Sequence, residues 1–246
     1  MMMIAIANQK GGVGKTTTAV TLAHGLALKN HNVLLVDLDP QGQCASHLGR
    51  EQTDGVFNLL VNAPPLRDVV RTTARPGLWL LAGSKRTKTA ETLMAIEGHG
   101  VDTLAAILTE RVNGDRLHYL VLDTAPSAGG LQENALYACD LLVIPSAVDY
   151  LSLEGVGEIL QTLAALNRPE PPVIRILPTF YDAVTKESAT NLAQLREAFG
   201  VAVLDPIHRA VVLRECPALG ATVFEHAPES RAATEYGSLV WEVIDG

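Results

Sequence analysis

The sequence has few cysteines, few aromatic residues and no long apolar segment. Its cysteines, Cys44, Cys139 and Cys216, lie far apart and form no CxxC pair. An odd number of scattered cysteines is typical of reduced thiols in the cytosol, and it excludes a disulfide-linked scaffold. Because no apolar run reaches the roughly 18 residues that a membrane-spanning helix needs, we expect no span across a bilayer.

Positive charge is also scarce. The chain of 246 residues has 19 lysines and arginines against 27 aspartates and glutamates, a formal net charge of −8. This balance argues against a general nucleic-acid coat, although it leaves room for a local basic patch. The opening MMMIAIANQ lacks the positive charge of a signal peptide. The closing SLVWEVIDG lacks the basic residues of a membrane-surface helix.

Apolar residues are abundant, at 48% of the chain, and they gather in short runs. The runs are continuous rather than alternating, which is typical of strands buried on both faces. Their alternation with helical patterns predicts an α/β fold, a doubly wound and mostly parallel sheet with helices on both faces, in a single domain over 1–246. The predicted strands are 3–7, 33–37, 78–82, 119–123, 141–145, 173–178 and 201–204. The predicted helices are 15–29, 100–112, 130–138, 152–167, 187–199 and 230–244. We interpret the basic stretch SKRTKT (84–89) as a solvated loop.

The stretch KGGVGKTT follows the first predicted strand and opens the first predicted helix. Its glycines let the backbone approach an anion closely, so that N–H groups of the loop point at phosphate oxygens. The positive end of the helix dipole adds to this attraction. We expect Lys15 to reach the β- and γ-phosphates of a nucleotide, and the Thr16 hydroxyl to ligate Mg²⁺. The predicted loop comprises Lys10, Gly11, Gly12, Val13, Gly14, Lys15, Thr16 and Thr17.

Three aspartates stand where predicted strands end. Asp37 and Asp39 follow the second strand, and Asp123 ends the fourth. Ligands of such sheets bind at the carboxyl ends of the strands, where these carboxylates and the loop converge. In P-loop enzymes an aspartate at such a place supports the metal. The predicted metal site therefore consists of Thr16, Asp37, Asp39 and Asp123.

The loop departs from the pattern G-x-x-x-x-G-K-[ST], because Gln9 stands where the first glycine would fall. With its early lysine it resembles the deviant Walker A motif of the ParA/MinD family of dimeric ATPases. Three further stretches match in order, VLLVDLDPQGQ (33–43), YLVLDTAPS (119–127) and DYLSLEGVGEIL (149–160). IHRAVVLRECPALG (207–220) and HAPESRAATEY (226–236) are similar to the C-terminal third of the ParA/Soj branch. The resemblance covers nearly the whole chain.

This resemblance implies slow ATP hydrolysis with Mg²⁺ in an ATP-dependent homodimer. It also implies a role for the second lysine of the loop, Lys10, because the early lysine of the family touches the phosphates bound by the other subunit. The physics agrees, because two ammonium groups in one loop repel each other until a triphosphate neutralises them. The implied catalytic residues are Lys10, Lys15, Asp39, which orients the attacking water, and Asp123. Those implied beside the adenine are Phe180, Asp182, Pro206 and Ile207.

Relatives in the ParA branch bind DNA without sequence preference as ATP dimers, with a ParB-like partner that stimulates hydrolysis. The resemblance thus implies a cytoplasmic, nucleoid-associated protein that segregates a chromosome or plasmid. The candidate DNA contacts are Lys186, Arg209, Arg214 and Arg231. Val184 stands where relatives often carry an arginine, and nearby glutamates dilute the patch. Because the chain starts at the phosphate-loop strand, we expect no N-terminal helix-turn-helix and no operator binding.

Other functions stay open at this point. A ParA-like positioner of a protein cargo would use the same motifs. A MinD-like membrane regulator would need a basic amphipathic C-terminal helix, which the sequence lacks. A metal-cluster carrier would need a close cysteine pair, and a small-molecule kinase or ligase would need an acceptor pocket.

Overall fold

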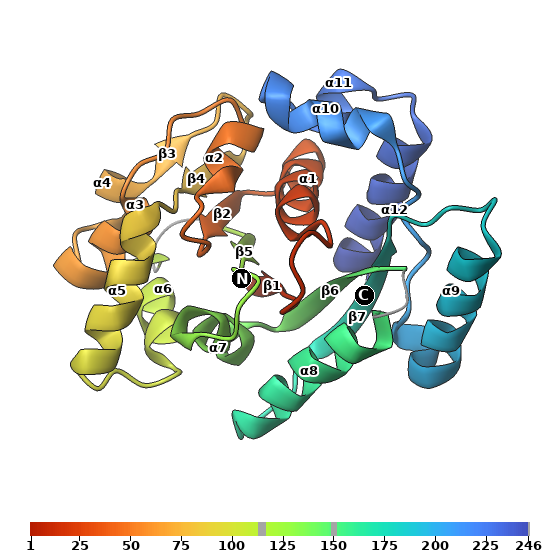
Figure 1. Ribbon diagram of the computed structural model, residues 1–246. Coiled ribbons are helices and arrows are strands. Elements are labelled where there is room, and N and C mark those ends of the chain that lie inside the picture. Colours follow the sequence, from red (N-terminus) through yellow and green to blue (C-terminus); the bar gives the residue numbers. More distant parts are fainter. Residues whose placement is uncertain (113–116, 149–151, 246) are drawn as a thin grey trace.

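The computed structural model describes residues 1–112, 117–148 and 152–245, which form one seven-stranded sheet covered by helices (Figure 1). The spatial order is β3-β4-β2-β5-β1-β6-β7. The strands are β1 (Met2–Ile6), β2 (Val33–Asp37), β3 (Arg71–Thr72), β4 (Leu78–Leu81), β5 (Tyr119–Asp123), β6 (Leu141–Ala147) and β7 (Val173–Thr179). Among the strands of the described residues, only β3 pairs antiparallel, at the edge of the sheet. The predicted fold class is therefore confirmed.

The register of the central strands brings the candidate site together. Asp37 of β2 lies opposite Asp123 of β5, and Asp123 lies opposite Ile6 of β1. The carboxyl ends of these three strands therefore end at one level, directly below the loop that follows β1. This is the place where ligands bind in open α/β sheets.

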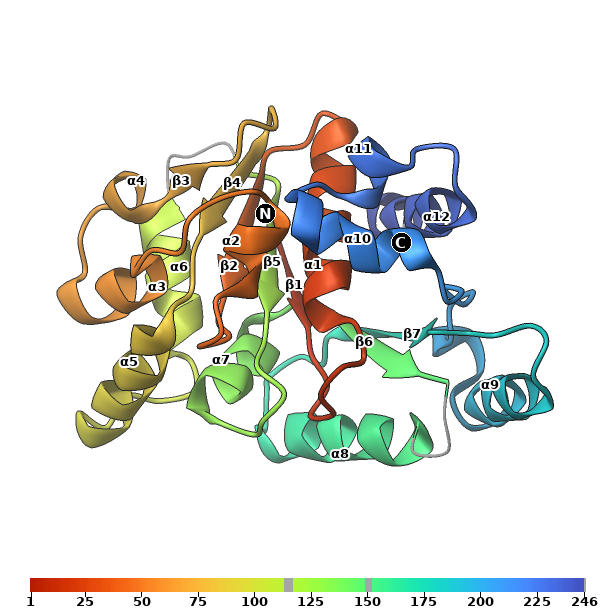
Figure 2. The ribbon, with the colours of Figure 1, turned by 45° about the horizontal axis from the view of Figure 1, so that its top comes forward.

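Alternate residues of each strand pack on opposite faces of the sheet. Ile4 and Leu35 belong to one buried cluster, while Ala5 and Leu34 belong to the other. The first face is covered by α1 (Lys15–Leu28), α2 (Gln43–His47), α10 (Val211–Leu219), α11 (Val223–His226) and α12 (Arg231–Asp245). Figure 2 shows α1 between α2 and the α10–α12 group on this face.

The second face carries the remaining helical elements, from α3 to α9. They are α3 (Gly55–Phe57), the π-helix η1 (Asn58–Asn62), α4 (Leu66–Val69), α5 (Lys85–Ile96), α6 (Thr103–Val112), α7 (Gly130–Ala138), α8 (Ser152–Ala165), α9 (Lys186–Phe199) and the 3₁₀ turn η2 (Gly200–Ala202).

Two expectations from the sequence are wrong. The strand over 201–204 is the 3₁₀ turn η2 followed by one isolated bridge between Val203 and Ile176. Gly200, at φ 55°, turns the chain there, so only this short contact with β7 forms. The stretch 84–89 is the start of α5 rather than a loop. The Ser84 hydroxyl accepts a hydrogen bond from the Arg86 N–H at 3.1 Å, which caps the helix.

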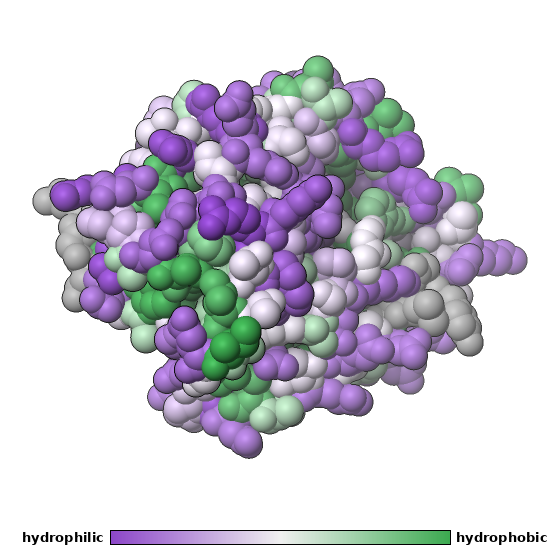
Figure 3. Space-filling view, turned by 60° about the vertical axis from the view of Figure 1, so that its left-hand side comes forward, coloured by the Kyte–Doolittle hydropathy of each residue, from purple (hydrophilic) through white to green (hydrophobic). Residues whose placement is uncertain are grey.

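The side of the molecule formed around α3–α5 carries apolar residues among polar ones (Figure 3). Val61 and Ile96 are exposed there.

In the described part of the chain, no helix combines the length and the apolar character that crossing a membrane requires.

Candidate nucleotide-binding site

The loop between β1 and α1 has the backbone that its sequence predicts. Gly12 and Gly14 have φ values of 73° and 90°, in the left-handed region that favours glycine. Gly14 is the N-cap of α1, and no side chain caps this helix end. The free N–H groups and the positive end of the helix dipole therefore face the loop, which suits an anion.

Lys15 is the first residue of α1 and is buried. Its Nζ donates a hydrogen bond to the carbonyl oxygen of Lys10 at 2.9 Å. Burial lowers the pKa of this ammonium group, although the charges of Asp123 and Asp39 act in the opposite direction. The charge of Lys15 is thus held in a poorly solvated place where an anionic ligand would stabilise it.

Lys10 lies on the outer side of the loop. Its backbone N–H donates to Asn8 Oδ1 at 2.9 Å, and its Cβ lies 3.8 Å from the place that a Cβ on Gly155 of α8 would take. It is not among the residues that line the cavity described below, and neither are its loop neighbours Gly11 and Val13. Its predicted role across a dimer stays a prediction.

Asp37 and Asp123 are completely buried, side by side at the ends of β2 and β5. Burial raises the pKa of Asp37 well above its usual value, and the charge of Asp123 adds to this. The carboxylate of Asp37 accepts the N–H of Asp39 at 3.2 Å and that of Cys44 at 3.0 Å. Asp37 therefore holds the loop 39–44 in place.

Asp123 has one oxygen with a partner and one without. Its Oδ2 accepts the thiol of Cys44 at 3.3 Å, while its Oδ1 has no partner among the described residues. Burial raises the pKa of Asp123 to about 6, opposed by hydrogen bonds from Thr16 and Cys44. A buried carboxylate oxygen without a partner, beside the Thr16 hydroxyl, is the hard oxygen donor set that fits Mg²⁺.

Cys44 is a contact that the sequence did not predict. Its sulfur and the carboxylates of Asp37 and Asp123 lie within 4.8 Å of one another. Its place in DLDPQGQCA, seven residues after Asp37, was the available signal. All three described thiols are free and buried, as expected for reduced cysteines.

Asp39 differs from the two deeper carboxylates because it lines the open cavity. Its Oδ1 accepts the N–H of Gln41 at 2.8 Å, which fixes the side chain at the start of the turn. A carboxylate so placed, at the cavity wall near Lys15, can orient a water molecule that attacks a phosphate.

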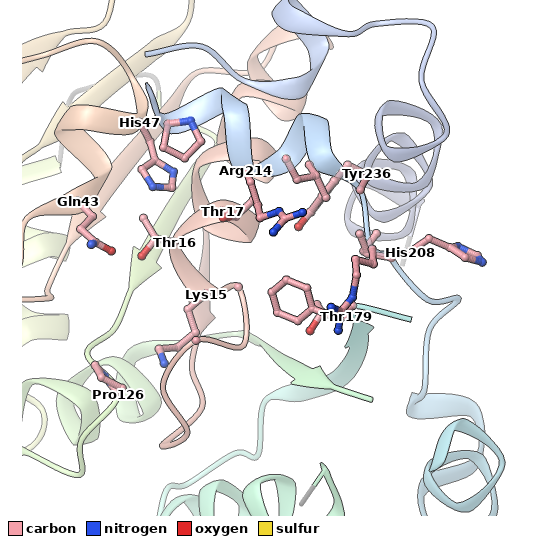
Figure 4. Close-up of a pocket in the computed structure, with 18 of the residues that line it drawn as sticks. Lys15, Thr16, Thr17, Gln43, His47, Pro126, Thr179, His208, Arg214 and Tyr236 are labelled. Carbon is pink, nitrogen blue, oxygen red and sulfur yellow. The ribbon is translucent and has the colours of Figure 1, made fainter. Parts of the chain in front are cut away.

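A cavity of about 710 Å³ opens above the loop, a volume typical of ligand sites. One wall consists of Lys15, Thr16 and Thr17, with Gln43 and His47 of α2 beside them (Figure 4). The opposite wall comes from the end of β7, the segment before α10, α10 itself and α12. It contributes Thr179, Phe180, Ile207, His208, Arg209, Ala210, Leu213, Arg214, Pro217 and Tyr236.

Two of the four residues predicted beside the adenine line this cavity. Phe180, in a left-handed conformation with φ 54°, and the buried Ile207 belong to its wall. Asp182 and Pro206 do not. The Asp182 carboxylate instead accepts the N–H of Val184 at 3.0 Å and so shapes the turn before α9.

The candidate DNA contacts come from different elements of the fold. Arg209 and Arg214 line the cavity, whereas Lys186 begins α9 and Arg231 begins α12. Arg231 Nε lies 3.4 Å from the Glu235 carboxylate. That carboxylate also accepts two hydrogen bonds from His208, through its backbone N–H and its ring Nδ1.

The sequence missed most of the opposite wall. Leu213, Pro217 and Tyr236 are apolar or aromatic residues whose spacing gives no sign of a ligand, and α10 is short and contains a proline. The only signal was the resemblance of 207–220 and 226–236 to a known family. Of the matching stretch 149–160, residues 149–151 lie outside the described residues.

Comparisons with known proteins agree with this geometry. The family model described as AAA domain matches residues 1–176. The chromosome-partitioning ATPase Soj of Thermus thermophilus is 41% identical over 246 residues, which cover 98% of this chain and 94% of Soj.

Two solved structures share the fold. Apo McdA of Cyanothece has a TM-score of 0.88 at 22% identity, over 99% of both chains. Cobyrinic acid a,c-diamide synthase of Mycobacterium smegmatis, solved with an ATP analog and magnesium, has a TM-score of 0.84 at 27% identity, over 99% of this chain and 94% of the synthase. The chain belongs to the AAA domain family, and within it to the Soj and ParA group of chromosome-partitioning ATPases.

Proposed function

We propose that this protein hydrolyses ATP as an ATP-dependent homodimer, binds nucleoid DNA without sequence preference, and segregates a chromosome. The observation that carries the proposal is the phosphate loop, in which Lys15 donates to the Lys10 carbonyl oxygen and lines the cavity together with Asp39, while the buried Asp123 lies close enough to interact with the Lys15 charge. The names of the relatives favour a chromosome as the cargo.

The residues of the cavity suit in-line attack of water on the γ-phosphate. N–H groups of the loop and the Lys15 ammonium hold the phosphates, and Asp39 orients the attacking water. Thr16 and Asp123 would hold Mg²⁺, which when bound neutralises charge on the phosphates. Positioning and charge neutralisation supply most of such catalysis, so hydrolysis can act as a slow timer.

The second lysine of the loop supports nucleotide-dependent dimerisation. Lys10 lies outside the cavity of its own chain, on the α8 side of the loop. In a two-fold dimer the same face meets itself, so each Lys10 would reach the phosphates bound by the partner. Without a triphosphate the four lysines of the two loops repel one another, and the dimer does not close.

DNA binding then follows from doubling a weak basic surface. A monomer with a net charge of −8 and scattered arginines attracts DNA poorly, whereas a dimer presents each cation twice. Binding should therefore require ATP and fall steeply with salt. A ParB-like partner would stimulate hydrolysis and release the DNA, in a cytoplasmic protein that associates with the nucleoid.

The test combines solution mass with DNA mobility shift. Light scattering of wild-type protein should give a dimer with a non-hydrolysable ATP analogue and a monomer with ADP. Lys10→Ala should still bind the analogue but remain monomeric, while Lys29→Ala at the far end of α1 should dimerise normally. DNA should shift only with the dimeric state, and less at the higher of two salt concentrations. A Lys10→Ala protein that dimerises fully contradicts the proposed role of Lys10.

A further inference from the structure

Arg214 is a charged side chain on the cavity wall that faces the phosphate loop. It belongs to α10, on the same side as Leu213 and Pro217, which also line the cavity. Figure 4 shows it reaching from α10 into the cavity, between Thr17 of the loop and Tyr236 of α12. Within the described part of the chain, its guanidinium group has no hydrogen-bond or ion-pair partner. Of the other arginines nearby, Arg75 and Arg231 are paired, whereas the side chain of Arg209, which also lines the cavity, has no hydrogen-bond or ion-pair partner among the described residues either.

The position of α10 is fixed by contacts at its C-terminus. Gly220 follows α10 and packs against Gly49, which follows α2, so closely that a Cβ on Gly220 would lie 2.5 Å from the Gly49 Cα. Arg75 donates to the carbonyl oxygens of Gly220 at 2.9 Å and Leu48 at 3.0 Å. The wall that carries Arg214 is thus attached to α2, which lines the other side of the same cavity.

We propose that Arg214 binds the phosphate groups of the bound nucleotide from the wall opposite the phosphate loop. The backbone of a phosphate loop holds the α- and β-phosphates, and Thr17 stands at that end of the loop. A guanidinium group forms paired hydrogen bonds with phosphate oxygens, and no group in the described ranges competes for that of Arg214. This inference rests on the proposed function, since it takes the ligand of the cavity to be a nucleotide.

The consequence is a nucleotide that connects two parts of the chain. Its phosphates would be held by α1 on one side and by α10 on the other, 200 residues away in sequence. The resemblance to the ParA branch suggested DNA for Arg214, yet this exposed side chain reaches toward the cavity that also contains the phosphate loop. DNA phosphate is therefore the alternative ligand that an experiment must distinguish.

The test uses ligands with different numbers of phosphates. Calorimetric titration with ADP and AMP, and NMR titration with adenosine, would compare the wild type with Arg214→Gln and Arg214→Lys. Arg196→Gln is the matched control. Arg196 belongs to α9, pairs with Asp205, and does not line the cavity. Arg214→Gln should weaken ADP and AMP roughly 10- to 100-fold and leave adenosine unchanged, with a smaller loss in Arg214→Lys.

Three results would overturn the inference. An equal loss for adenosine and ADP would mean that the substitution distorts the cavity. Unchanged ADP affinity together with weaker DNA binding in the mobility shift would assign Arg214 to DNA. A wild type that binds none of the three ligands would contradict the proposed function itself, and this inference with it. A melting curve of Arg214→Gln in the absence of ligand would verify folding.

Discussion

The two walls of the cavity are built in different ways. The phosphate side stands on β1, β2 and β5 in the middle of the sheet, and its Lys15, Asp37 and Asp123 are buried. Most of the opposite wall comes from residues 207–217, which belong to no strand of the sheet, and its Arg209 and Arg214 are exposed. The first wall is fixed by the central strands, whereas the second combines packing of Ile207, Cys216 and Tyr236 on the core with a few polar contacts.

Those polar contacts join residues that are distant in sequence. Arg75 reaches Gly220 and Glu225, 145 and 150 residues away. The Glu235 carboxylate holds His208 by its backbone N–H at 2.9 Å. The phosphate side is thus built on buried residues of the central strands, and we call it the rigid wall, while the opposite wall depends in addition on single ion pairs and hydrogen bonds.

Among the substitutions considered, removal of the Lys15 ammonium group from the rigid wall should reduce ATP affinity most. Lys15→Ala should lower ATP affinity roughly 100-fold, since hydrogen bonds between charged groups contribute about 3 kcal/mol at most. The fold should survive, because the buried ammonium group is poorly solvated there. Calorimetric titration with ATP measures the loss. Lys29→Ala, at the other end of the same helix, is the matched control and should bind like the wild type.

A Lys15→Ala protein with wild-type ATP affinity would contradict the assignment of the loop. It would also mean that the phosphate loop does not contribute more to nucleotide affinity than the opposite wall, since Arg214→Gln would then weaken nucleotide binding more than Lys15→Ala.

The rigid wall is also the part that the sequence predicted well. VLLVD and YLVLD are apolar runs that each end in an aspartate, and both are strands with the predicted limits, 33–37 and 119–123. The loop KGGVGKTT leads into a helix at Lys15, as expected. Here the local sequence pattern and the buried environment favour the same structure, so the sequence was sufficient to predict these two strands and the start of α1.

The other wall was not predictable from local pattern. The run VAVL has the composition of a strand, but Gly200 turns the chain before it, and only the bridge between Val203 and Ile176 forms against the edge strand β7. The helix α10 contains Pro217 and lies against α2 through Gly49 and Gly220. Such contacts are decided by tertiary packing, which no window of neighbouring residues contains.

The next largest effect should come from Arg75, which holds the second wall. Its side chain is nearly buried, and it donates to Glu225 and to the carbonyl groups of Leu48 and Gly220. Arg75→Ala leaves these acceptors without a partner, so the free energy of unfolding should fall by about 3 kcal/mol. The melting temperature should drop by roughly 6–12 °C.

Thermal and urea unfolding measure this loss, with Arg196→Ala as the control. Arg196 pairs with Asp205 on the surface, so its removal should change the free energy of unfolding by less than about 1 kcal/mol. Equal stability of the two variants would show that the second wall does not depend on the Arg75 contacts.

The smallest effect concerns His24, which joins the two walls. It lies buried on α1, its Nδ1 is 2.6 Å from the Thr222 hydroxyl, and Glu225 lies 4.0 Å away. Burial lowers the pKa of His24 to about 4, while the charge of Glu225 opposes this shift and that of Arg75 adds to it. The native protein therefore keeps the ring neutral at pH values where the unfolded chain takes up a proton.

This difference in proton uptake determines how the free energy of unfolding changes with pH. Between the unfolded pKa of about 6.5 and the native one, unfolding binds a proton, so stability falls as the pH falls. At about pH 6 the loss relative to neutral pH should be about two thirds of a kcal/mol from His24 alone. Burial lowers the pKa of His47 and of His31 as well, so they act in the same direction. The informative quantity is thus the difference between wild type and His24→Gln in urea unfolding across this range. His24→Gln should reduce the dependence of the free energy of unfolding on pH. Parallel curves for the two proteins would mean that His24 does not take up a proton on unfolding in this range.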